Sequence, residues 1–249
     1  MALSSGAFAQ VTNTFNGNGN TGFGGAVGTS SLQVVSLADG TLNFTWTRGT
    51  GDFNDALVLY IDSTSGGFAD TLSFNDQADP LRQAISGASG GTTGIDANTR
   101  STVTFNTGFT ANYAFAANTG FGGLWTLASG GNNSLIFNAA TGFAPTGSAT
   151  AATYSWSFNA SSIGLTANSG ESFKFVGTYL NSGNSFRANE ALGFNIAGGN
   201  PGAGGIGSNP NTIASSEFTF QTIPEPSTYA LLGLAATGLG AHVLRRRRR

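Results

Sequence analysis

Short runs of alternating apolar and polar residues fill the chain from residue 10 to residue 222, and clusters of Gly, Asn, Ser and Thr separate them. In the run Thr41–Thr47, every second residue is large and apolar (Leu42, Phe44 and Trp46), and those between are Asn or Thr. An alternation of period two gives a strand one apolar and one polar face, which is typical of antiparallel sheets. The runs therefore predict strands, and the clusters between them predict turns.

The strands expected from these runs are Ser31–Leu37, Thr41–Thr47, Ala56–Ile61, Thr71–Phe74, Thr102–Asn106, Ala111–Ala116, Leu124–Leu127, Ser134–Phe137, Thr153–Phe158, Ser172–Tyr179, Ala191–Ile196 and Glu217–Gln221. Ala56–Ile61 is apolar throughout, so we expect a central strand covered on both faces. No segment of the body shows a good period of 3.6 residues with helix caps. The pattern predicts an all-β protein, an antiparallel β-sandwich of the jelly-roll or Ig-like kind. A parallel β-solenoid is the alternative, but no regular repeat of about 20–30 residues is present.

The composition fits one folded domain. Hydrophobic residues make up 39% of the 249 residues, and 20 Phe provide enough apolar area for a core. Charged residues make up only 9%. We assign residues 10–222 to one β-sandwich domain, in which the Gly-, Asn- and Pro-rich stretch 198–211 is a loop.

Several kinds of chemistry are excluded or disfavoured. Without cysteine, and with His242 as the only histidine, the body has no disulfide, no Cys-based zinc site and no His-based triad. Two G-x-G-x-x-G matches, at residues 17–22 and 202–207, neither follow a buried parallel strand nor open a helix, so no nucleotide site is expected. The acids that could serve a glycoside hydrolase are isolated in sequence: Glu171, Glu190 and Glu217. We therefore expect no catalytic residues and a non-enzymatic protein, with a secreted hydrolase as the least favoured alternative.

Half of the twelve acidic residues lie within the 28 residues from Asp52 to Asp79. Loops at one end of a sandwich can bring such oxygen ligands together around calcium. The candidate ligands are Asp52, Asp55, Asp62, Asp76 and Asp79. Their spacing fits no EF-hand loop, and Asp is common in turns, where it bonds its own backbone. We favour the turn interpretation, with a structural calcium as the alternative and no other cofactor.

Large aromatic rings are the candidate contacts for a sugar ligand: Trp46, Trp125, Trp156, Tyr60, Tyr113 and Tyr179. Most occupy apolar positions of expected strands, which favours the core, and burial of all three Trp would weaken a sugar-binding interpretation. The sequence N-T-G-F-G-G occurs at residues 20–25 and again at 118–123. We interpret both copies as turns in which Gly takes positive φ and Phe enters the core.

The two ends of the chain carry sorting features. Ala7 and Ala9 have the small-x-small spacing of a signal-peptidase site, so residues 1–9 are interpreted as the remnant of a secretory signal. Near the other end, Pro224, Glu225 and Pro226 precede the uncharged apolar run 229–244, about 24 Å long as a helix, against a hydrocarbon core of about 30 Å. The chain ends in a basic tail of five residues: Arg245, Arg246, Arg247, Arg248 and Arg249. We expect one hydrophobic membrane helix with its tail in the cytoplasm and the body outside.

The net charge of −2 conceals an asymmetry, because residues 1–244 contain five basic and twelve acidic residues. The resulting charge of −7 leaves no basic surface for a phosphate backbone, so no nucleic-acid partner is expected.

The order Pro-Glu-Pro, apolar helix and Arg run in residues 223–249 resembles a PEP-CTERM sorting signal. This resemblance implies a bacterial exported protein that is a transient partner of an exosortase, an integral-membrane cysteine protease. It also implies an inner-membrane precursor, cleavage near Pro-Glu-Pro, and release or anchoring at the cell surface or in an exopolysaccharide matrix.

Two segments of the body, Asp55–Asp62 and Ala111–Ala114, are similar to strands of carbohydrate-binding-module and DOMON-like β-sandwiches. At one position of the second segment, Asn112 stands where those proteins have Asp. The expected function is thus a non-enzymatic surface or biofilm-matrix protein, with a surface-attached carbohydrate-binding module as the alternative.

Overall fold

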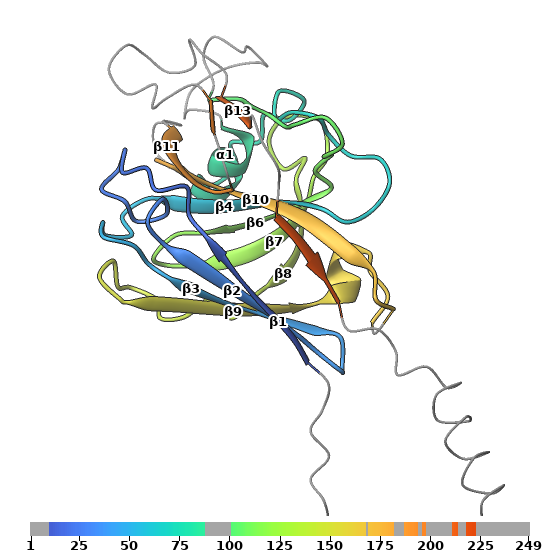
Figure 1. The fold of residues 1–249 in the computed structure, drawn as a ribbon. Coiled ribbons are helices and arrows are strands. Elements are labelled where there is room, and N and C mark those ends of the chain that lie inside the picture. Colours follow the sequence, from blue (N-terminus) through green and yellow to red (C-terminus); the bar gives the residue numbers. More distant parts are fainter. Residues whose placement is uncertain are drawn as a thin grey trace, which may run out of the picture.

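Two antiparallel β-sheets face each other and form the body of the protein (Figure 1). The structure is a computed structural model that describes residues 10–87, 101–167, 169–181, 187–193, 196–197, 211–213 and 218–222. The first sheet has the strand order β1-β2-β3-β9. These strands are β1 (Gln10–Asn16), β2 (Ser31–Leu37), β3 (Thr41–Thr47) and β9 (Thr153–Asn159).

The second sheet has seven strands, in the order β11-β10-β4-β6-β7-β8, and β14 also pairs with β10. Its members are β4 (Ala56–Asp62), β6 (Tyr113–Ala117), β7 (Gly122–Thr126), β8 (Ile136–Ala140), β10 (Ser172–Leu180), β11 (Arg187–Leu192) and β14 (Phe218–Gln221). A small third sheet joins β12 (Ile196–Ala197), β13 (Asn211–Ile213) and β5 (Val103–Thr104), and only its β13–β5 pair is parallel. Because both large sheets are antiparallel throughout, the β-solenoid alternative is wrong and the antiparallel all-β prediction is confirmed.

The main core lies between the two large sheets and is rich in aromatic rings. The ring of Trp156 stacks on Phe44 of the first sheet, with centroids 5.3 Å apart, and on Phe115 of the second sheet, with centroids 4.3 Å apart. Such pairs contribute about 0.5–1.5 kcal/mol beyond the area that they bury. Trp156 therefore joins the two layers directly.

Strand β4 is buried on both faces, as its apolar sequence predicts. Leu57, Leu59 and Ile61 belong to the core between the sheets. Val58 and Tyr60 point the other way, into a second core that covers the outer face of the seven-stranded sheet and includes residues of helix α1 (Pro80–Ser86). Figure 1 shows α1 on the side of this sheet that faces away from the first sheet.

Helix α1 contradicts the expectation that the body has no capped helix. The Asp79 carboxylate accepts hydrogen bonds from the backbone N–H groups of Leu81 (3.0 Å) and Arg82 (2.9 Å), and Pro80 opens the helix. Gly87 ends it with φ of 64°. These are ordinary cap residues. The helix has only seven residues, so its period of 3.6 repeats too few times to stand out in the sequence.

Other expected elements also differ. Thr71–Phe74 forms a turn in place of a strand, because the Asp70 side chain accepts the N–H of Leu72 at 2.8 Å. The edge strand β1 was missed, because its exposed residues are mostly polar. A short 3₁₀ helix at Ala160–Ile163 was also missed. The expected strand Ala191–Ile196 is replaced by β11 and β12, and residues 198–210 of the expected loop lie outside the described residues.

Candidate functional site

Three aromatic rings meet on the outer face of the seven-stranded sheet, at its β8 edge. Phe121 directly precedes β7, and Gly123 and Trp125 lie within it. The three residues follow each other at intervals of two, so their side-chain positions share one face of the sheet. Trp125 pairs with Phe137 of β8. The register shifts between the pairs Leu124–Ala139 and Trp125–Phe137, which leaves one extra residue in β8. Such a β-bulge changes where the neighbouring side chains point.

Gly123 allows the rings to converge. The Phe137 ring centroid lies 5.5 Å from that of Trp125 and 6.2 Å from that of Phe121. A Cβ atom added at Gly123 would lie only 2.8 Å from Trp125, 2.9 Å from Phe137 and 3.0 Å from Phe121. Any larger residue at this position would therefore push the three rings apart.

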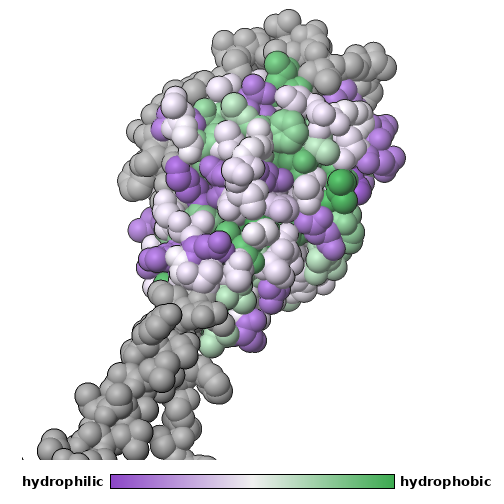
Figure 2. All heavy atoms as spheres, turned by 90° about the vertical axis from the view of Figure 1, so that its right-hand side faces the viewer, coloured by the Kyte–Doolittle hydropathy of each residue, from purple (hydrophilic) through white to green (hydrophobic). Residues whose placement is uncertain are grey.

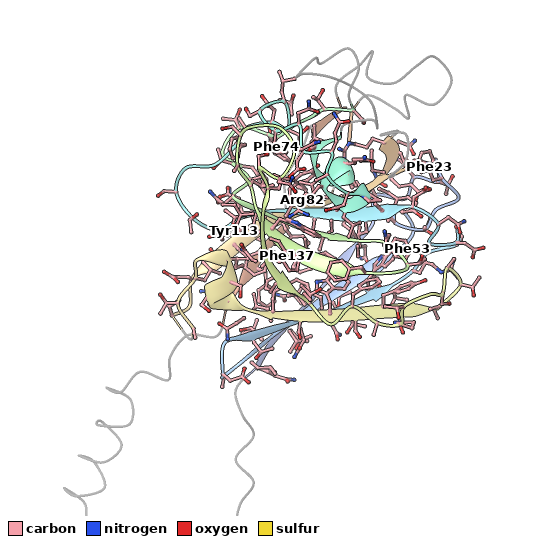
Figure 3. The ribbon with its side chains drawn as sticks, turned by 180° about the vertical axis from the view of Figure 1, so that it is seen from behind. Phe23, Phe53, Phe74, Arg82, Tyr113 and Phe137 are labelled. Carbon is pink, nitrogen blue, oxygen red and sulfur yellow. The ribbon has the colours of Figure 1, made fainter. Side chains whose placement is uncertain are left out.

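Helix α1 supplies the polar side of this site. Asp79, Pro80, Leu81 and Arg82 line a pocket of about 450 Å³ together with Asn118 and the three rings. The Arg82 guanidinium lies 5.9 Å from the centroid of the Trp125 ring, a cation–π distance. Figure 3 shows Arg82 between α1 and Phe137. We call this the ring pocket.

Two carboxylates hold Arg82 in place. Its guanidinium forms an ion pair with Asp79 and a second ion pair with the Oδ2 atom of Asp76, at 3.3 Å. Asp76 is fully buried, and its carboxylate also accepts the N–H groups of Leu135 and Ala78, both at 3.0 Å. The cation of the ring pocket is thus held in place by two carboxylates of its own neighbours.

Asn118 positions the loop that carries Phe121. Its Oδ1 atom accepts the backbone N–H groups of Gly120 (2.9 Å) and Phe121 (3.0 Å). The Phe121 side chain is 41% exposed and that of Phe137 is 45% exposed. The indole N–H of Trp125 is buried and has no hydrogen-bond partner within the described part of the chain.

The rings selected from the sequence are not the exposed ones. Trp46, Trp125 and Trp156 are all buried, at 0%, 2% and 3% exposure. Tyr60 and Tyr179 are also buried, and Tyr113 is partly buried. The sequence signal that was missed is the pair Ile136–Phe137, two adjacent apolar residues in an edge strand, together with a Phe121 flanked by Gly residues.

The five candidate calcium ligands do not converge. Asp52 pairs with Arg48 at 3.4 Å, Asp62 accepts the N–H of Thr110 at 3.0 Å, and Asp76 and Asp79 pair with Arg82. Burial, and next the charge of Glu190, raise the pKa of the fifth, Asp55. Within the described ranges, no group of three or more His, Cys, Asp or Glu side chains could hold a metal ion. This placement favours the turn and ion-pair interpretation.

Chelation tests the remaining calcium hypothesis. Because four of the five candidate carboxylates already have partners in the protein, excess EDTA should leave the melting temperature unchanged. A metal bound only to the native state would stabilise it by mass action, so its removal would lower that temperature. Differential scanning calorimetry with and without EDTA, and with calcium added back, distinguishes the two. A calcium-reversible fall of several degrees would restore the metal interpretation.

Glu190, one of the acids considered for hydrolysis, has a structural role. Its side chain is fully buried, and its carboxylate accepts four backbone N–H groups from the loop between β1 and β2. The donors are Phe23 (2.5 Å), Gly25 (2.9 Å), Val27 (2.9 Å) and Gly28 (3.3 Å). Glu171 is exposed and accepts the N–H of Thr166 at 2.7 Å, which together with Ser169 lowers its pKa. Glu217 lies outside the described residues.

The sorting features at both ends also lie outside the described residues: Ala7, Ala9, the motif Pro224–Pro226, the apolar run 229–244 and the tail Arg245–Arg249. In the part of the chain that is described, no helix is long and apolar enough to cross a membrane. The last described residue, Thr222, is tied to the body by two hydrogen bonds to the Glu171 carbonyl, from its N–H (2.9 Å) and its Oγ1 (2.8 Å).

Residues 222–249 match the PEP-CTERM protein-sorting motif. The resemblance noted in the sequence is therefore confirmed for this segment, and it marks the chain as the exported precursor of a protein sorted to the cell surface through an exosortase. Neither the curated proteins nor the solved structures contain a match to the chain. The similarity of the body to carbohydrate-binding-module and DOMON-like sandwiches stays a prediction. Its two segments lie in adjacent strands, where Ile61 pairs with Tyr113.

Proposed function

We propose that the chain is a non-enzymatic protein of the bacterial cell surface or biofilm matrix. The β-sandwich is the part delivered, and residues 223–249 deliver it. Residues 229–244 hold the precursor in the inner membrane with the tail Arg245–Arg249 in the cytoplasm. The exosortase cuts near Pro224–Pro226 and frees the body. The released body lies among exopolysaccharide and interacts with it.

The observation that carries this proposal is where the sorting motif begins. The match starts at residue 222, directly after β14, whose register with β10 joins Gln221 to Ser172. The last described strand thus ends directly before the sorting segment starts. Two prolines after that point favour an extended chain that joins neither the sheet nor a helix, which suits a protease at the membrane surface.

The described acids support a non-enzymatic role. Glycoside hydrolysis needs two carboxyl groups that face each other across the substrate. In the described ranges, Glu190 is enclosed by four N–H groups, Asp76 is buried against Arg82, and Glu171 caps an exposed loop. Each is engaged in holding the fold.

The surface suits a hydrated matrix. With charged residues at only 9%, the protein depends on neutral polar side chains for its solubility. On the face shown in Figure 2, the green apolar patches are small and are separated by white and purple residues. Such a surface interacts with neutral polymers through hydrogen bonds more than through charge.

Sorting is tested by replacing Pro224, Glu225 and Pro226 with Ala in the native host. The precursor should then accumulate uncut in the inner membrane, and deletion of the exosortase should have the same effect on the unchanged protein. The matched control replaces Pro201 and Pro210 with Ala, which alters two prolines that precede the motif and should leave sorting unchanged. Surface delivery that is unaffected by both the motif change and the deletion would overturn the proposal.

The second candidate function is a carbohydrate-binding module. The burial of all three Trp weakens the hypothesis that these rings contact a sugar. The ring pocket favours sugar binding independently, because Phe121 and Phe137 are exposed there beside Arg82 and Asn118.

A further inference from the structure

We propose that the ring pocket binds a neutral glycosyl unit of a polysaccharide, stacked on the exposed rings of Phe121 and Phe137. The inference rests on the proposed function in one respect: export places the pocket where polysaccharide is found. The binding itself follows from the chemistry of the pocket.

The exposed rings need an explanation, because the described part of the chain buries nearly all of its large apolar side chains. Among the described residues, only Phe121, Ile136 and Phe137 are large, hydrophobic and exposed. Two of these three line the same pocket. A sugar ring has an apolar C–H face and a rim of hydroxyl groups, so it pairs with an aromatic face that has polar neighbours. A purely apolar ligand would need no such polar rim.

Several local features build this arrangement. Gly123 makes room for the rings to converge, the bulge in β8 sets the direction of Phe137, and Asn118 holds the loop at Phe121. Polar residues accompany the rings: Asp79, Arg82 and Asn118 all line the pocket. Its volume of about 450 Å³ falls in the range of roughly 300–1,000 Å³ typical of small-molecule sites.

The charges of the pocket select a neutral sugar. Arg82 is the one cation among the residues that line it, and both Asp76 and Asp79 pair with its guanidinium. Two carboxylates against one guanidinium leave an excess of negative charge. A uronic acid would meet that excess without a free cation to pair with, whereas hydroxyl groups can donate to the carboxylate of Asp79.

The shape of the site favours a sugar over a protein partner. A stable protein interface buries roughly 1,200–2,000 Å² in total. The exposed apolar residues here are two rings over a small pocket and the adjacent Ile136, which is 58% exposed. This is too small for the apolar centre of such an interface, but it matches one or two sugar rings.

The test measures binding of the full-length chain, purified in detergent so that the result does not depend on sorting. Affinity electrophoresis in gels that contain dextran, laminarin, xylan or galactomannan gives the affinity for neutral polymers, and alginate is the acidic comparison. We expect retardation by at least one neutral polymer and none by alginate. Phe121→Ala and Phe137→Ala should each weaken that binding at least tenfold.

Ile136→Ala is the matched control, because Ile136 is exposed and precedes Phe137 in the same strand but does not line the pocket. Its affinity should stay within twofold of the unchanged chain. Gly123→Ala is a second variant, which should weaken binding at least tenfold by displacing the rings. Melting curves of all variants identify any loss that comes from unfolding.

Three results would overturn the inference: no neutral polymer retards the chain, alginate binds more tightly than the neutral polymers, or folded Phe121→Ala and Phe137→Ala chains bind as the unchanged chain does. If the ring variants instead abolish a dimer seen by light scattering and leave sugar binding intact, the pocket is an interface between copies. Each of these results leaves the sorting proposal untouched, and a failure of sorting leaves this test unchanged.

Discussion

Replacing Glu190 with Ala should lower the free energy of unfolding by about 3–5 kcal/mol. The carboxylate is fully buried and is the acceptor for four backbone N–H groups in the segment from Phe23 to Gly28. Alanine leaves these donors without their acceptor and opens a cavity at the same place. Glu190 belongs to β11 and is more than 160 residues away from this loop in sequence. The change therefore also removes the contacts that hold the connection between β1 and β2 against β11.

Urea denaturation followed by tryptophan fluorescence measures this loss. Glu190→Gln keeps one oxygen acceptor, so its free energy of unfolding should lie between those of the unchanged chain and Glu190→Ala. Glu171→Ala is the matched control, because that carboxylate also accepts a loop N–H, from Thr166, but it is exposed to solvent. Its midpoint should stay close to that of the unchanged chain. A Glu190→Ala protein within 1 kcal/mol of the unchanged chain would show that the loop does not depend on this carboxylate.

Asp76→Ala should cost a similar amount, about 3–5 kcal/mol, because it leaves two backbone N–H groups without their acceptor and the partly buried Arg82 guanidinium without one of its partners. Asp76 accepts the N–H groups of Leu135 and Ala78 and pairs with Arg82, and it has no exposure to water. Its loss should release the loop before α1 and the residue that leads into β8. Urea denaturation monitors this effect as well.

Asp79→Ala provides the comparison within the same cluster. Asp79 also pairs with Arg82, but its side chain is 36% exposed and its main role is to cap α1. Loss of such a cap costs about 1 kcal/mol. If Asp76→Ala proved no more harmful than Asp79→Ala, the burial of the Asp76 carboxylate would not be what stabilises this corner.

The sequence predicts well those strands that have one face in the core and the other face in water. In β3 and β9 the alternation of large and small residues matches the burial pattern residue by residue, because one face packs in the core and the other faces water. The central strand β4 was also recognised, because burial on both faces requires an unbroken apolar run. These are local patterns that a single segment contains.

The two copies of N-T-G-F-G-G show why other features could not be predicted. In the first copy, Gly24 and Gly25 take φ of 96° and 88°, and Phe23 packs against the core, as expected. In the second copy, Gly122 and Gly123 lie inside β7 and Phe121 is exposed. Identical segments differ here because their partners differ: a buried carboxylate from β11 in one case and the rings of the edge strands in the other.

The ring pocket and the Glu190 contacts both depend on such distant partners. Trp125 is one of the six rings that the sequence offers as sugar contacts, but its neighbours Phe121, Phe137 and Arg82 become visible only once β7, β8 and α1 are placed together. The sorting segment is the opposite case. Its meaning lies in the order of residues along the chain, so the sequence predicted it without the fold.

The C-terminus of the mature protein is the measurement that tests sorting most directly. Intact mass spectrometry of the surface fraction, in a host that has an exosortase, should give a species that ends between Thr222 and Tyr229 and lacks Arg245–Arg249. Through Ile223 the chain contains eleven acidic and five basic residues, so this species should carry a formal charge near −6. Surface-exposed protein that keeps the complete tail Arg245–Arg249 would contradict exosortase sorting and leave a plain single-span anchor.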